Sequence, residues 1–416
     1  MAQYRTDQKK LDGQSLVSRY EVGMLSDRLT PGGTLTDAFG RLRISDSLTL
    51  FDSQHRYQDN GKWNTSNTAS SNTVYQANES AVDLNVDTTS GHYVYRETKK
   101  VFAYQPGKSL LIMNTFVMNT PKANLRQRVG YFGSQNGVFL ENDGTTTYLV
   151  LRSYVTGAVV ESRVQQSDWN VDKFDGTGYS TQIGSSDHGN LDITKSNIFW
   201  IDVEWLGVGD VRCGFVVDGK MCIAHIFHND NKNPTTYMTT ACLPCRYEIE
   251  NTGTTASNST LKQICSTVIS EGGYQLEGKQ RSVGVPLTAP KTLTTAGTFY
   301  PVISIRLKNT RQDAIVIPRN LEFVGVTNNT RYRYKIVVGA TLDANANWQS
   351  ASSNSSIEYD MSATGYTGGD DAKVGYLVVS AGNSANIAGF GDGLFKYQLE
   401  RDTFANTTST FSLVAT

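Results

Sequence analysis

Four side chains able to bind a metal ion share one short segment: Cys222, His228, Cys242 and Cys245. Thiolate and imidazole groups at such spacings are usual ligands of zinc. His225 also lies here, but a strand over 220–227 would direct it to the face opposite Cys222 and His228. The alternative is that the cysteines are small buried residues, reduced in the cytosol. We favour this alternative and expect no metal and no cofactor.

Hydrolytic chemistry has weaker support. Ser186, Asp187 and His188 are adjacent in sequence, but adjacency does not orient a nucleophile towards its base, and no Gly-x-Ser-x-Gly elbow is present. Asp202 and Glu204 alternate along a predicted strand and could form the carboxylate pair of a glycosidase. We therefore expect a surface loop around Ser186 and no enzymatic activity.

Trp200, Asp202 and Glu204 have a second interpretation. An indole beside two carboxylates can form a platform that binds sugar without cleaving it. The alternatives without sugar binding are that the acids form a solvent-facing polar row and that the tryptophan packs in the core. Trp200, Asp202 and Glu204 are therefore a candidate glycan platform only.

The charge balance argues against two classes of partner. The chain has 416 residues, with 38 Lys and Arg against 39 Asp and Glu, a formal net charge of -1. Binding to nucleic acid needs a positive footprint that this sequence lacks. No apolar run has the ~18 residues of a membrane span. The polar start lacks a signal-peptide hydrophobic region. We expect neither nucleic-acid binding nor membrane insertion, and synthesis in the cytoplasm.

The elements that would position these side chains are β-strands. Phe199, Ile201 and Val203 alternate with polar or indole residues in the period of two that marks a half-buried strand. Turns at 207–210 and at Asp218-Gly219 then predict strands over 211–217 and 220–227. The meander is similar in style to lectin-like and laminarinase-like jelly rolls. No helix longer than a turn or two is predicted.

The composition of the chain predicts a division into three segments. Residues 1–60 lack a sustained period and are predicted to be an extended N-terminal docking arm. Residues 61–285 are predicted to be a jelly-roll-like β-sandwich, which could itself be one domain or two. Pro286 and Pro290 mark a linker, after which residues 286–416 are predicted to be a smaller C-terminal β-sandwich. The fold class is therefore all-β.

The most distinctive sequence lies in residues 37–57, which contain Phe-Gly-Arg-Leu-Arg-Ile-Ser and then Thr-Leu-Phe-Asp-Ser-Gln-His-Arg-Tyr. This segment resembles the N-terminal region of virion structural proteins of tailed bacteriophages. The resemblance covers roughly the first sixth of the chain. It implies a virion protein associated with the capsid or tail, such as a fiber, with other virion proteins as partners.

The arm is expected to dock through apolar anchors and ion pairs. The predicted assembly residues are Phe39, Arg41, Arg43, Leu50, Phe51, Asp52, Arg56 and Tyr57. Charged groups at such a site often fix register. We expect binding by multivalent protein–protein contacts, with a homo-oligomer such as a trimer. The alternatives are a carbohydrate-binding appendage that recognises the host surface and, less favoured, a depolymerase.

Overall fold

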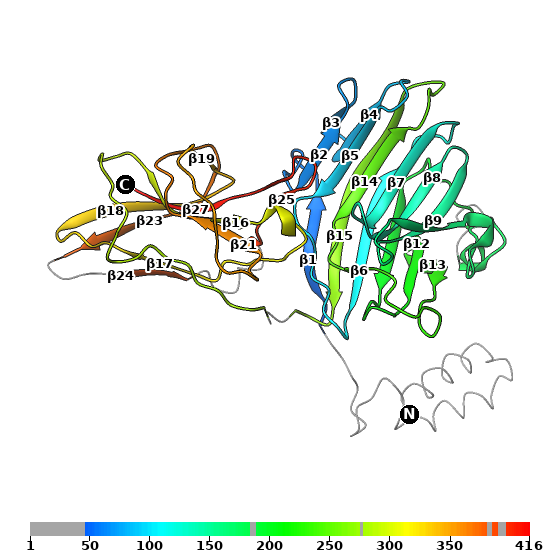
Figure 1. Ribbon diagram of the computed structural model, residues 1–416. Helices are drawn as coiled ribbons and strands as arrows, with labels where there is room; N and C mark the ends of the chain where they lie inside the picture. The colour runs from blue at the N-terminus through cyan, green and yellow to red at the C-terminus, as the bar shows by residue number, and fades with distance from the viewer. Residues whose placement is uncertain (1–45, 184–188, 275–277, 381–384, 390–396) are drawn as a thin grey trace, which may run out of the picture. The chain divides into compact units, whose positions relative to one another are not determined.

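The computed structural model describes residues 46–183, 189–274, 278–380, 385–389 and 397–416, and these residues form antiparallel β-sheets (Figure 1). The all-β prediction is confirmed. The helical elements within the described residues are short: η1 (Gln166–Asp168), α3 (Tyr179–Ile183) and η2 (Asn309–Arg311). The chain divides into two compact units, one of Met1–Ser47 with Glu271–Gly273 and one of Leu48–Ser270 with Tyr274–Thr416.

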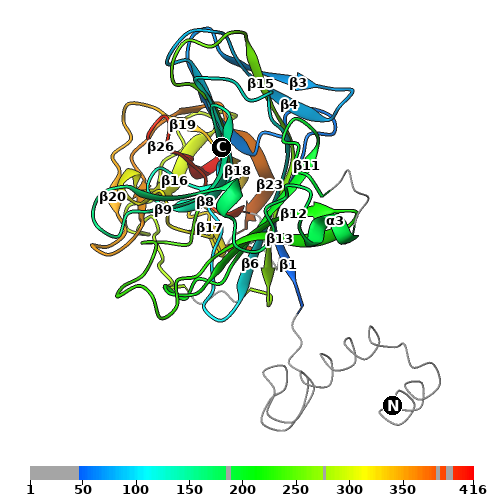
Figure 2. The same cartoon turned by 90° about the vertical axis from the view of Figure 1, so that its right-hand side faces the viewer.

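The first large sheet has eight strands in the order β13-β12-β11-β6-β15-β4-β3, and β1 also pairs with β15. Its strands are β1 (Leu48–Gln54), β3 (Asn72–Gln76), β4 (Ala81–Val86), β6 (Ser109–Val117), β11 (Asn197–Val203), β12 (Val211–Val217), β13 (Lys220–Phe227) and β15 (Ser259–Glu271). The loop that carries α3 lies beside β13, where the backbone N–H groups of Val171 and Asp172 donate to the Ala224 carbonyl (Figure 2).

The second large sheet has seven strands in the order β10-β9-β8-β7-β14-β5-β2. Its strands are β2 (Trp63–Asn67), β5 (Tyr93–Thr98), β7 (Leu125–Phe132), β8 (Gly137–Asp143), β9 (Thr146–Ser153), β10 (Val160–Gln165) and β14 (Cys245–Asn251). One hydrophobic cluster draws side chains from both large sheets, including Leu84, Phe199, Val129 and Ile249. The two sheets therefore form a sandwich around one core.

The third sheet has six strands in the order β20-β21-β16-β27-β18-β23. Its strands are β16 (Tyr300–Leu307), β18 (Thr330–Val338), β20 (Gln349–Ser350), β21 (Ile357–Asp360), β23 (Asp370–Val379) and β27 (Phe411–Ala415). Two-stranded pairs accompany it: β17 (Asn320–Val324) with β24 (Ala385–Gly389), β19 (Thr341–Leu342) with β22 (Tyr366–Thr367), and β25 (Arg401–Asp402) with β26 (Thr407–Thr408).

The cores of the two regions are separate. Every buried member of the sandwich cluster lies between residues 51 and 268. The clusters built around Tyr334, Ile336 and Val414 draw only on residues 293–415. The two sets are joined in sequence by a coil that contains Pro286 and Pro290.

Residues 48–54 differ from the expectation of an arm that extends to residue 60. β1 pairs with β15 of the same chain, from Leu48 opposite Ser270 to Gln54 opposite Cys265. Phe51 is buried in the sandwich core. The strand forms because a free edge of β15 satisfies its backbone groups and the core accepts its aromatic ring.

Candidate functional site

A cleft of about 550 Å³ lies among β2, β16, β19 and the β25–β26 hairpin. Its lining residues are Asn64, Lys99, Arg306, Gly339, Ala340, Thr341, Leu342, Asp343, Ala346, Trp348, Glu400, Arg401, Asp402, Thr407, Thr408, Ser409 and Thr410. This volume lies within the range of pockets that hold small ligands. Polar and hydroxyl groups outnumber apolar ones in the lining.

Backbone hydrogen bonds around Arg401 build one wall of the cleft. The Arg401 N–H donates to the Lys99 carbonyl at 2.9 Å, and the Asn64 amide donates to the Arg401 carbonyl at 2.6 Å. The Arg401 guanidinium lies 3.3 Å from Glu97, which also accepts a hydrogen bond from the Thr403 hydroxyl. The β25–β26 hairpin is thereby held against the end of β5.

The opposite wall carries an indole. The guanidinium carbon of Arg306 lies 4.0 Å from the centroid of the Trp348 ring, a cation–π distance. Arg306 Nε donates to Glu358 at 2.6 Å, which fixes the guanidinium and therefore the ring. Among the described residues, no carboxylate forms an ion pair with Lys99. The cleft thus offers an ordered aromatic ring, a cation and several hydroxyl groups.

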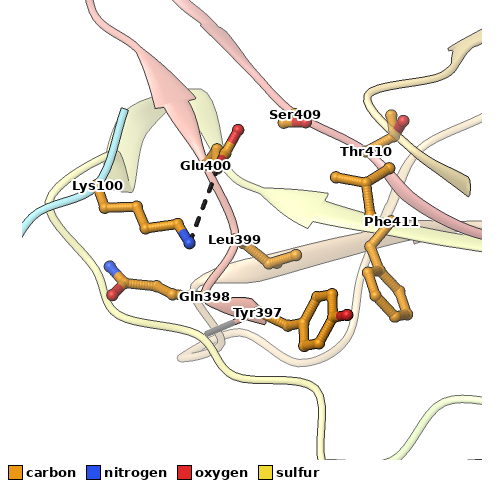
Figure 3. A pocket seen from close by; sticks show the side chains of 9 residues that line it. Lys100, Tyr397, Gln398, Leu399, Glu400, Ser409, Thr410 and Phe411 are labelled. Carbon is orange, nitrogen blue, oxygen red and sulfur yellow. Dashed lines mark ion pairs between the residues drawn. The ribbon is translucent and has the colours of Figure 1, made fainter. Parts of the chain in front are cut away.

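A smaller pocket adjoins the cleft and shares Glu400, Ser409 and Thr410 with it (Figure 3). Its volume of about 50 Å³ is room for water rather than for a ligand. Lys100 and Glu400 face each other across it at 3.9 Å. Burial lowers the pKa of Lys100, and Glu400 acts in the opposite direction. The larger cleft is therefore the better candidate site.

The outer face of the seven-stranded sheet carries a chain of ion pairs. Alternation along β7 and β14 directs Val129, Tyr247 and Ile249 into the core, so their neighbours point to the other face. Acids and arginines alternate there, in the order Glu141, Arg128, Glu248, Arg246, Glu97 and Arg401. The successive distances are 2.6, 3.2, 2.7, 3.0 and 3.3 Å. We call these six residues the ion-pair chain.

Arginine neutralises the buried carboxylates of this face. Burial alone would raise the pKa of Glu248, but Arg246 and Arg128 outweigh burial and hold that pKa below its ordinary value. Burial likewise opposes the charge of Arg128, yet Glu248 and Glu141 raise its pKa. The Arg128 and Arg152 guanidinium groups also lie over the Phe139 ring at 5.3 and 4.9 Å. The face is thus packed and internally compensated.

The remaining acids of this face are paired as well. Glu250 contacts Arg126 at 2.7 Å, and Glu161 contacts Arg152 at 2.8 Å. Asp143 contacts Arg163 at 2.9 Å. A general acid needs a carboxyl group that keeps its proton near neutral pH. An arginine partner favours the opposite, ionised form.

The predicted glycan platform is not an exposed surface at its tryptophan. Trp200 is 3% exposed, and its ring lies so close to Gly214 that a Cβ there would come within 2.7 Å of it. Asp202 is half-buried, 3.8 Å from Arg212. Glu204 is exposed but follows the end of β11. The strand therefore brings Trp200 and Asp202 to one face without leaving the indole open to a sugar.

The predicted zinc ligands lie in different surroundings. Cys222 and Cys245 belong to the hydrophobic core, and Cys242 is half-buried. His228 instead contacts Asp210 at 2.8 Å. Within the described ranges, the one group of three or more side chains arranged for a shared ion is Asp210, His228 and Asp230. Sequence reasoning missed Asp210, although its position beside the predicted strand start was a usable signal.

The opening motif is only partly described. Phe39, Arg41 and Arg43 lie outside the described residues. Leu50 is half-buried against the sandwich core, and Phe51 belongs to that core, so the expectation that Phe51 anchors a docking arm is corrected. Asp52 and Lys62 form an exposed pair at 3.7 Å.

Arg56 and Tyr57 lie at the surface. The Arg56 guanidinium carbon is 5.0 Å from the Tyr57 ring centroid, and Tyr57 is 80% exposed. These two residues remain candidates for an assembly contact. Across the described part of the chain, no helix is long and apolar enough to span a membrane.

Comparisons with known proteins give fold likenesses alone. No family model and no curated protein matches the sequence. A solved CBM2 module from the evolved Dit of Lactobacillus casei BL23 phage J-1 is similar with 7% identity and a TM-score of 0.37, over 56% of this chain and 100% of that chain. A Bacillus licheniformis β-glucanase is similar with 11% identity and a TM-score of 0.33, over 52% and 96%.

A carbohydrate esterase from the Shiga toxin-encoding bacteriophage phi24B is similar with 12% identity and a TM-score of 0.32, over 55% of this chain and 100% of that chain. Two of these three proteins are phage-derived. Identities and TM-scores this low assign no activity to the chain, because one fold hosts many functions.

Proposed function

We propose that this protein is a component of a tailed-phage particle that binds carbohydrate on the host surface and does not cleave it. The observation that carries the binding role is the cleft that contains Trp348 and Lys99. The phage assignment rests on the resemblance of residues 37–57 to virion structural proteins.

The chemistry of the cleft suits a sugar. An indole packs against the C–H face of a pyranose, and hydroxyl groups exchange hydrogen bonds with its hydroxyls. Thr341 and Thr407 are exposed in the lining. Lys99 adds one cation, which favours a glycan that carries carboxylate or phosphate groups.

We propose that the glycan is not cleaved, because the two aspartates that line the cleft, Asp343 and Asp402, already accept hydrogen bonds from neighbouring residues. Asp343 accepts hydrogen bonds from the Thr364 hydroxyl and from the Thr364 and Asn345 backbone, and the Thr364 hydroxyl is the main cause that lowers its pKa. Asp402 accepts from the Phe404 and Ala405 N–H groups at 3.0 and 3.1 Å. The pKa of Asp343 is thus held below its ordinary value, whereas glycoside hydrolysis needs one protonated carboxyl.

Glycan-array binding of the purified full chain tests the proposal. Trp348→Ala and Lys99→Ala should each weaken binding about tenfold or more, because stacking on the indole and contact with the cation each contribute ~1–2 kcal/mol. Tyr57→Ala is the matched control, since Tyr57 is an exposed aromatic that does not line the cleft. Equal binding by all three variants would contradict the site, and release of reducing sugar would contradict the non-catalytic role.

A second candidate role is assembly through β23. This strand ends the six-stranded sheet, and Val374, Tyr376 and Val378 on one of its faces are 44, 66 and 60% exposed. Exposed apolar rows on edge strands promote pairing between chains. Sedimentation of the full chain tests this role. Tyr376→Glu should lower the oligomeric state of the parent. If the parent and the variant are both monomers, this role is excluded.

A further inference from the structure

Asp210 and His228 face each other at the open end of the β12–β13 hairpin. The last residue pair of this hairpin is Val211 with Phe227, so the next residue on each strand stands opposite the other. His228 Nδ1 lies 2.8 Å from Asp210 Oδ2. Asp230 follows two residues later, and one ligand atom from each of the three side chains lies within 4.8 Å of the others.

Asn229 holds this arrangement. Its backbone N–H donates to Asp210 Oδ1 at 3.1 Å. Its side-chain amide donates to the carbonyls of Gly209 and Phe227 at 3.1 and 3.2 Å. Asn231, with φ of 52°, reverses the chain after Asp230. The second carboxylate oxygen of Asp210 is therefore presented to His228 by a fixed backbone, as ligand sites require.

The charges of the group are not balanced. Two carboxylates share the space with one imidazole, and among the described residues no Lys or Arg forms an ion pair with Asp210 or Asp230. Carboxylates this close repel each other unless a proton or a cation lies between them.

A buried hydroxyl beside the group lacks a partner. Tyr237 is 5% exposed, and no described residue hydrogen-bonds its hydroxyl. Its backbone N–H donates to the Gly207 carbonyl, which ties it to the loop before Asp210. Burial, and after it the neighbours Tyr104 and Asp210, raise the pKa of this hydroxyl, so it stays protonated. Buried donors are normally satisfied, and water bound to an ion would satisfy this one.

We propose that Asp210, His228 and Asp230 bind a divalent transition-metal ion such as Zn²⁺. An imidazole with two carboxylates suits Zn²⁺ or Mn²⁺, whereas Ca²⁺ takes oxygen ligands alone. The exposed His228 and Asp230 can close on bonds of ~2.0–2.2 Å. Three protein ligands leave coordination positions for water or a partner group. This site is independent of the cleft proposed to bind carbohydrate.

Isothermal titration of the metal-free full chain with Zn²⁺ tests this site. One ion per chain should bind, and the melting temperature should rise with it. His228→Ala and Asp230→Asn should each weaken binding on the order of tenfold or more. Both positions are exposed, so circular dichroism should show folded variants.

Two control variants sharpen the test. His92→Ala removes another surface histidine of the sandwich, paired with Asp87 at 2.7 Å but belonging to no three-ligand group among the described residues, and it should bind Zn²⁺ like the parent. Cys242→Ser should also bind normally, which separates this site from a cysteine site. The proposal is overturned if the parent binds no Zn²⁺, if His228→Ala binds as the parent does, or if Ca²⁺ binds more tightly than Zn²⁺.

Discussion

The Phe51 ring packs edge-on against the Trp63 indole, with ring centroids 6.0 Å apart and planes at 74°. The same ring lies 5.0 Å from Phe102. In addition, the Trp63 indole N–H donates to the Ser53 hydroxyl at 2.8 Å. The described part of the most distinctive motif of the sequence therefore attaches β1 to the sandwich.

Phe51→Asp should destabilise the sandwich itself. The change removes buried ring contacts and places a charge in the core, which together cost about 3–5 kcal/mol or more. Chemical denaturation followed by tryptophan fluorescence measures this cost. Tyr57→Asp is the matched control and should change the free energy of unfolding by less than ~0.5 kcal/mol, because Tyr57 is 80% exposed. Equal free energies of unfolding for the two variants would show that Phe51 does not contribute to the core.

Two truncations should behave differently. Removal of residues 2–45 leaves β1 intact, so the remaining chain should fold with the melting temperature of the parent. Removal of residues 2–57 takes β1 away from β15 and should lower the melting temperature or prevent folding. If the opening segment docks on the particle, the shorter truncation should be folded but missing from purified virions. Normal incorporation of that folded truncation would refute docking.

Arg128→Met should be strongly destabilising. It leaves Glu141 and Glu248 buried beside a vacant position in the ion-pair chain, and loss of one partner of a buried pair costs about 3–5 kcal/mol. Arg212→Met is the control, because Arg212 is exposed and lies 3.8 Å from Asp202. Urea denaturation of both variants gives the comparison. A loss below about 1 kcal/mol for Arg128→Met would show that the neighbours compensate.

Acid should weaken the fold partly through His55. This imidazole is fully buried, and burial, with Arg96 as the second cause, lowers its pKa from 6.5 to about 4. The unfolded chain therefore binds more protons between these values, so stability falls as the pH drops from 6.5 towards 4. The contribution of His55 is at most about 3 kcal/mol. Thermal melts of the parent and of His55→Gln should show a smaller pH slope in the variant, and identical slopes would exclude this cause.

Local patterns predicted the hairpins well. Residues 211–217 and 220–227 form the two strands expected of them, joined at Asp218 and Gly219, whose φ angles of 47° and 76° suit a tight hairpin turn. Phe199, Ile201 and Val203 point into the core as their alternation indicated. Period and turn chemistry are local properties, so a single sequence contains them.

Long-range pairing was not predictable in this way. β6 lies between β11 and β15, and β14 lies between β7 and β5. The Glu97–Arg246 contact joins residues 149 positions apart. The alternation of Arg126 with Arg128, and of Arg246, Glu248 and Glu250, marked charged strand faces in the sequence. Their mutual neutralisation depends on which strands become neighbours, so it emerged only from the sheet order.

The hydrophobic cores of the two regions share no buried side chains. Recombination could therefore exchange the residues after Pro290 without changing the core packing of the first region. A replacement for the second region would need to reproduce the contacts of Arg401, which pairs with Glu97 and exchanges hydrogen bonds with Lys99 and Asn64. Exchange of the second region would then alter the lining of the cleft, to which both regions contribute, and leave the sandwich core unchanged.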